Sequence, residues 1–190
     1  MQLNRWQPTA WWLEPLTSLL GTDPREKLVV PGRKLATWER LLAAVPSAQR
    51  TRVARPRHPE CCESGLGLRT GHLDAAHEWV QHASDPSGMA WHCLMHRLEG
   101  DLGNAKYWSR RVGRHPIHER LAEAIQHATE LPTEFKALLI DSRGRWLAEP
   151  WIDLWGDRRL RSEPGWSEAA EAIAILEWEL LFAHSLEAEN

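Results

Sequence analysis

The 190-residue chain has few cysteines and no long apolar run. Of its three cysteines, Cys61 and Cys62 are adjacent and Cys93 lies within a predicted helix, so a disulfide framework is excluded. No apolar run approaches the ~20 residues that a membrane-spanning helix needs. The N-terminus also lacks a basic region followed by an apolar one, which a signal peptide would have. These absences predict a cytoplasmic protein that does not enter a membrane.

Positive charge is missing from the C-terminal part of the chain. No Lys or Arg follows Arg161, whereas seven Glu do, and residues 25–57 hold nine Lys or Arg. Three readings are open: solvated faces of opposite sign, mutual attraction of the two regions, or contact of the basic region with an anionic partner. The net charge is only −3, and the sequence indicates no groove or helix that matches phosphate geometry. We therefore expect no nucleic-acid partner.

Aromatic residues are also few, except for tryptophan. The chain has twelve Trp against two Phe and one Tyr. Trp38, Trp79, Trp91 and Trp108 recur inside helical patterns, and a Trp side chain buries a large area. We therefore expect most of the tryptophans to lie in a core.

Helical periodicity accounts for most of the sequence. It predicts an all-α fold, an irregular bundle of about six or seven helices, with helices over residues 9–20, 31–44, 72–82, 85–99, 104–112, 116–129 and 167–186. Glycines weaken the prediction of a helix over 60–71. Residues 131–160 are ambiguous between two short strands around 141–144 and short helical turns. Two parts are predicted: an N-terminal helical arm with a basic connection (1–59) and a central helical domain (60–190).

The stretch 85–116 carries the clearest signals. Asp85 suits an N-cap and Pro86 the first helical position, while Gly100 suits the left-handed residue that ends a helix. Asp101 then begins a second helix, which Gly113 ends. Because the connection is so short, the two helices should be antiparallel neighbours.

Two resemblances rest on this stretch. The segment GDLGNAKYWSRRV resembles the turn and second helix of one tetratricopeptide-type repeat, with no second copy at a 34-residue spacing. The pattern HxxxHRxEGDxxNAKYWxRR, with LDAAHEWVQ before it, is similar to a family of uncharacterised bacterial and fungal helical proteins. The first resemblance implies a helical hairpin of the repeat type, and the second implies no activity.

A metal site is the most specific chemical hypothesis. His92 and His96 lie one helical turn apart and can direct nitrogens at one ion, and His77 on the apolar stripe of the preceding helix could complete a three-histidine site with an open position. Glu99, one turn further, would be a ligand or a base. The implied cofactor is a divalent transition metal.

Two other readings use the same stretch. In the first, a polar pocket receives a small anionic ligand, with His96, Glu99 and Tyr107 as the groups that could move protons. Its ligand-binding residues would be Asp101, Asn104, Lys106, Arg110 and Arg111. In the second, the residues have structural roles only: Asp101 caps its helix, and Glu99 pairs with an Arg or Lys. His92 and His96 then lie at the edge of a core whose polar groups are all hydrogen-bonded.

The function that we predict from the sequence is a small helical module that binds a protein or peptide. The alternative is a metal-dependent, hydrolase-type enzyme or a protein that binds a small anion. A binding module should present an exposed apolar groove, whereas an enzyme should bring His77, His96 and Glu99 into one polar pocket. The oligomeric state is not predicted.

Overall fold

The structure is a computed structural model and describes residues 11–50 and 56–186. Within these ranges the regular structure is helical, and the β pairing in them is one isolated bridge between Ile140 and Trp146. The all-α prediction is therefore confirmed. The alternative of two strands around 141–144 reduces to this bridge, which closes a turn between two short helices.

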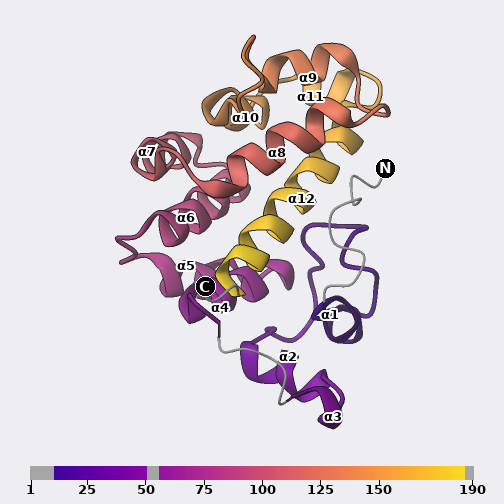
Figure 1. Ribbon diagram of the computed structural model, residues 1–190, viewed down its shortest axis with the longest axis vertical. Coiled ribbons are helices and arrows are strands. Elements are labelled where there is room, and N and C mark those ends of the chain that lie inside the picture. Colours follow the sequence, from indigo (N-terminus) through magenta and orange to yellow (C-terminus); the bar gives the residue numbers. More distant parts are fainter. Residues whose placement is uncertain (1–10, 51–55, 187–190) are drawn as a thin grey trace.

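From α4 onward the helices follow one another with short connections, whereas residues 21–37 form a long loop between α1 and α2 (Figure 1). The N-terminal ones are α1 (Leu13–Leu20), α2 (Trp38–Ala44), α3 (Ser47–Arg50), α4 (Pro59–Arg69) and α5 (Leu73–Val80). The central ones are α6 (Pro86–Glu99), α7 (Leu102–Val112) and α8 (Pro116–His127). The last ones are α9 (Thr133–Leu139), α10 (Ala148–Leu154), α11 (Arg159–Ser162) and α12 (Trp166–Leu186).

Helix α12 runs through the middle of the molecule and packs against α4, α6, α8 and α11 (Figure 1). It is buried on nearly all sides, since sixteen of its residues are buried. A helix that is apolar all round belongs in a core. Leu16 and Leu20 of α1, and Trp12 just before it, join the same hydrophobic cluster, so the N-terminal arm shares the core of the central helices. Residues 51–55 of the predicted basic connection lie outside the described ranges.

Helix α4 is regular despite its two glycines, which the sequence suggested would weaken it. A Cβ added at Gly65 would lie 2.7 Å from the ring of Trp91, so the absent side chain admits this ring against the helix backbone. The indole of Trp178 donates to the Gly65 carbonyl at 2.9 Å. Tight packing against two tryptophans therefore outweighs the conformational cost of glycine, which is about 1 kcal/mol.

The predicted caps of the α6 and α7 pair are present. The Asp85 carboxylate accepts from the backbone N–H groups of Ser87 and Gly88, and Gly100 ends α6 with φ at 84°. Asp101 accepts from the backbone N–H of Asn104 at 3.0 Å. Helices α6 and α7 pack against each other, and α5 packs on α6.

A buried ion pair joins α6 to α12. Arg97 is 1% exposed and donates to both carboxylate oxygens of Glu177, at 3.1 and 2.5 Å. The guanidinium also lies over the rings of Trp151 and Trp155, at 4.9 and 5.2 Å from their centroids. This cluster holds α10 against the core.

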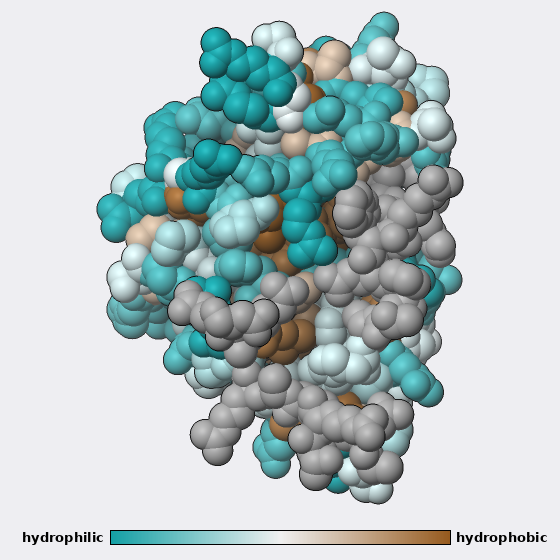
Figure 2. Space-filling view, in the orientation of Figure 1, coloured by the Kyte–Doolittle hydropathy of each residue, from teal (hydrophilic) through white to brown (hydrophobic). Residues whose placement is uncertain are grey.

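Most of the described surface on the face in Figure 2 is hydrophilic, and apolar residues come to the surface in a narrow strip. The large hydrophobic side chains that are exposed in the described ranges are Trp79 (49%) and Tyr107 (51%), on different helices. No helix in these ranges combines the length and the apolarity that crossing a membrane requires.

Candidate metal centre

Three histidines from two helices converge. His77 comes from α5, and His92 and His96 come from α6. One ring nitrogen of each lies within 4.8 Å of the others, and the Nε2 atoms of His77 and His92 are 2.9 Å apart. In the described part of the chain, this is the group of three or more potential ligands that lies close enough to hold one ion.

Local structure explains the convergence. Residues four apart on a helix lie on the same face, so the rings of His92 and His96 stack, with centroids 4.7 Å apart. The connection from α5 to α6 spans only residues 81–85, which keeps the two helices adjacent. The ring of His77 therefore reaches the other two, at 4.7 and 5.3 Å between centroids.

His92 is held in the neutral form. It is 3% exposed, and burial lowers its pKa to about 4, with further lowering by His96 and His77. Its Nδ1 is buried and has no hydrogen-bond partner in the described ranges. Because a metal binds the neutral imidazole, a depressed pKa keeps a lone pair of His92 available near neutral pH.

Glu99 contacts the cluster through His96. Its Oε2 lies 3.1 Å from Nδ1 of His96, so a proton on Nδ1 is donated to the carboxylate. This places the lone pair of His96 on Nε2. A carboxylate that fixes the tautomer of a ligating histidine is a common feature of metal sites. The geometry thus favours a positioning role for Glu99 over the base that the sequence suggested.

A tryptophan from α7 forms one wall of the cluster. The ring of Trp108 stacks on His92 with centroids 4.1 Å apart and an interplanar angle of 22°. The guanidinium of Arg111 lies over the Trp108 ring at 5.6 Å, and Tyr107 meets Trp108 edge-on at 5.3 Å. The sequence indicated Trp108 only as a core residue, because its spacing shows which face of α7 it occupies but not which ring it meets.

The cationic residues predicted for an anion pocket do not gather around the histidines. Lys106 forms an ion pair with Asp153, and Arg110 pairs with Glu149 at 2.9 Å, so both turn toward α10. Arg111 is exposed and lies on Tyr107 and Trp108. The side chain of Asn104 donates from Nδ2 to Oδ2 of Asp101, the N-cap of α7, at 2.8 Å. His96 therefore contacts Glu99 and His77, and these cations lie elsewhere.

A second group of histidines, which sequence reasoning did not single out, joins α4, α8 and α12. The ring of His115 meets His184 edge-on at 4.8 Å, and His184 stacks on His58. Nδ1 of His115 accepts from the backbone N–H of Ile117, so its proton lies on Nε2, 3.3 Å from Oγ of Ser87. His115 therefore donates to this serine and cannot take its proton. Burial lowers the pKa of His115 to about 3.

The donor set of the first cluster indicates which ions it suits. Imidazole nitrogens favour Zn²⁺, Cu²⁺, Ni²⁺ and iron, whereas Mg²⁺ and Ca²⁺ prefer oxygen. Three protein ligands leave at least one coordination position for water or substrate, as in catalytic zinc sites. The cluster of His77, His92 and His96 therefore fits a transition metal with an open position.

Comparisons with known proteins identify no similar protein. No protein-family model matches the chain, no curated protein matches it, and no solved structure matches it.

Proposed function

We propose that the protein binds one divalent transition-metal ion through His77, His92 and His96, and that it catalyses a hydrolysis-type reaction at the open coordination position. The observation that carries this proposal is the convergence of the three ring nitrogens within 4.8 Å. Two further features support it. His92 is neutral because burial lowers its pKa, and Glu99 orients His96 from outside the ligand set.

Each residue has a separate task in this proposal. The metal supplies a Lewis acid and can lower the pKa of a bound water to about 7. Glu99 holds the proton on Nδ1 of His96 and so keeps Nε2 free for the ion. Trp108 covers one face of His92 and limits rotation of that ring. The protein- or peptide-binding function stays a prediction, and the exposed Trp79 and Tyr107 on separate helices give it little support.

Metal titration of untagged, chelator-treated protein tests the first part of the proposal. We expect calorimetry with ZnCl₂ or NiCl₂ to give one equivalent bound, with a dissociation constant of about 1 μM or lower. His77→Ala, His92→Ala and His96→Ala should each weaken binding about 100-fold or more, and Glu99→Gln about 10-fold to 100-fold.

His127→Ala is the matched control, because His127 lies exposed on α8 and only bonds the Glu123 carbonyl. It should bind metal like the unsubstituted protein. Absence of binding, or equal binding by His92→Ala, would contradict the metal site. For the catalytic part, zinc-loaded protein should hydrolyse 4-nitrophenyl acetate about 10-fold faster than His92→Ala with the same zinc. Equal rates would remove the hydrolytic role and leave the metal site standing.

A further inference from the structure

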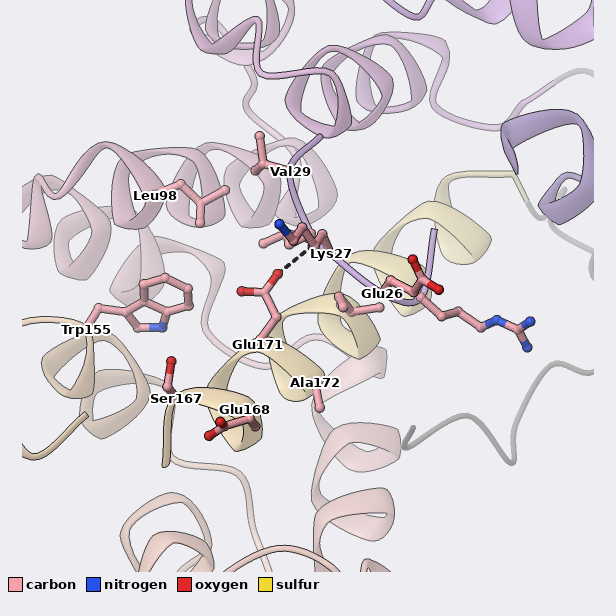
Figure 3. Close-up of a pocket in the computed structure, with 12 residues that line it drawn as sticks. Glu26, Lys27, Val29, Leu98, Trp155, Ser167, Glu168, Glu171 and Ala172 are labelled. Atoms are coloured by element: carbon pink, nitrogen blue, oxygen red, sulfur yellow. Dashed lines mark hydrogen bonds between the residues drawn. The ribbon is translucent and has the colours of Figure 1, made fainter. Parts of the chain in front are cut away.

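A cavity of about 530 Å³ lies between the segment 25–29 and the first turns of α12. It is bounded by the segment 25–29, by Leu98 at the end of α6, by Trp155 after α10, and by the first turns of α12 (Figure 3). The metal ligands do not line it. Its volume is in the range of 300 to 1,000 Å³ that is typical of small-molecule sites.

Of the three carboxylates that line this cavity, Glu26, Glu168 and Glu171, that of Glu171 lies nearest its centre in Figure 3. One oxygen of Glu171 accepts from the backbone N–H of Leu28 at 2.6 Å, which fixes the side chain. In Figure 3 the other oxygen points to the side of the cavity where Trp155 and Leu98 lie. Glu171 forms no ion pair within the described ranges, although Lys27 lines the same cavity. The buried Arg69 acts on Glu171 only at longer range, since its Nη2 donates to the Pro24 carbonyl.

Trp155, which lines the same cavity, has a hydrogen-bond donor that is not used. Its Nε1 is buried and has no hydrogen-bond partner among the described residues. Figure 3 shows this nitrogen on the edge of the ring that faces Ser167, whose hydroxyl does not bond to it. The ring is held in this orientation by Arg97, which lies over it. A buried N–H without an acceptor is unfavourable, so an acceptor oxygen that takes the place of the Ser167 side chain beside it would be favoured.

Part of the remaining wall is apolar, and the rest consists of the polar side chains of residues 25–27, Ser167 and Glu168. Leu98, Ala172 and Ile175 line the cavity, and the last two are buried parts of α12. A ligand that fits therefore needs a cationic donor for Glu171, an acceptor oxygen close by for Trp155, and a hydrocarbon part for these side chains. An α-amino group next to a carbonyl, on a carbon that bears an apolar side chain, combines the three within a few ångströms.

We propose that this cavity binds the α-aminoacyl group of a small apolar amino acid or of a peptide N-terminus. The ammonium group lies against the free oxygen of Glu171, the adjacent oxygen accepts from Trp155, and the side chain packs on Leu98 and Ile175. A free amino acid and a peptide share this chemistry. Lys27 would favour the free carboxylate of the former. The site does not depend on the proposed metal centre.

NMR of ¹⁵N-labelled, metal-free protein tests the proposal, with the indole signal of Trp155 assigned by its loss in Trp155→Phe. We expect L-leucinamide to shift this signal saturably, with a dissociation constant on the order of 1 mM or lower. N-acetyl-L-leucinamide lacks the ammonium charge and should bind about 10-fold more weakly. Tighter binding of L-leucine than of L-leucinamide and Leu-Gly-Gly would identify a free amino acid as the ligand, and the reverse a peptide.

Two variants separate a specific site from a general effect. Glu171→Gln still accepts from Leu28 but loses its charge, so it should weaken L-leucinamide binding about 10-fold. Glu168→Gln on the exposed rim of the same cavity should change it less than about 3-fold. If none of the three amines shifts the Trp155 signal at about 10 mM, or if N-acetyl-L-leucinamide binds as well as L-leucinamide, the proposal is wrong.

Discussion

Replacing Glu177 by leucine is expected to lower the free energy of unfolding by about 3–5 kcal/mol. The change leaves the guanidinium of Arg97 buried at 1% exposure without its carboxylate partner. It also removes the acceptor of the Trp151 indole N–H, which donates to Oε2 of Glu177 at 3.1 Å. Urea unfolding followed by circular dichroism measures the loss.

Two further variants show whether the uncompensated charge is the cause. In the double variant Arg97→Met/Glu177→Leu, both charges are replaced by apolar groups, so much of the lost stability should return. Glu149→Leu breaks an exposed ion pair, in which the side chain of Glu149 is 44% exposed and that of Arg110 is 64% exposed. That change should cost far less stability than Glu177→Leu. Equal losses for Glu149→Leu and Glu177→Leu would refute the explanation.

Acid should destabilise the protein through His115. This residue is 1% exposed, and burial, followed by His184 and His118, lowers its pKa from 6.5 to about 3. The unfolded chain therefore binds a proton more readily than the folded one. The contribution of His115 to stability is complete above about pH 6.5 and is lost as the pH falls from there toward 3, by roughly 1.4 kcal/mol per pH unit.

His115→Asn isolates this effect. Asparagine keeps an acceptor for the N-cap of α8, which His115 now provides to the backbone N–H of Ile117, but it does not titrate. Urea unfolding between pH 7 and pH 4 should therefore give a flatter dependence of stability on pH for this variant. His127→Gln on the exposed side of α8 should keep the original slope. An unchanged slope in His115→Asn would show that other groups carry the acid sensitivity.

The sequence predicted the elements whose signals are local. Asp85 and Gly100 bound α6 because caps depend on a few neighbouring residues. It misjudged α4, whose glycines are compensated by contact with Trp91, a residue 26 positions away from Gly65. It also left 131–160 ambiguous, because α9 and α10 have seven residues each and their apolar periodicity is too short to separate a helix from a strand.

In the candidate site, too, the local features could be predicted from the sequence and the long-range contacts could not. The spacing of His92 and His96 indicated a shared face, and the position of His77 on the apolar side of its helix indicated contact with α6. The direction of Lys106 and Arg110 could not be predicted, because it depends on Asp153 and Glu149 of α10, about 40 residues later in the chain. Such pairings arise from tertiary packing, which no local pattern encodes.

Because Trp108 stacks on His92, its fluorescence can be used to detect metal binding at the histidine cluster. The ring centre of this indole lies 4.1 Å from that of His92, so a change in the electronic state of the imidazole affects the indole directly. A paramagnetic ion such as Cu²⁺ or Ni²⁺ held there would quench the emission of Trp108, whereas Zn²⁺, with its filled d shell, would leave it largely intact. The fluorescence intensity with each of the two kinds of ion, measured for the unsubstituted protein and for Trp108→Phe, would show whether the metal binds next to Trp108. No added dye is needed.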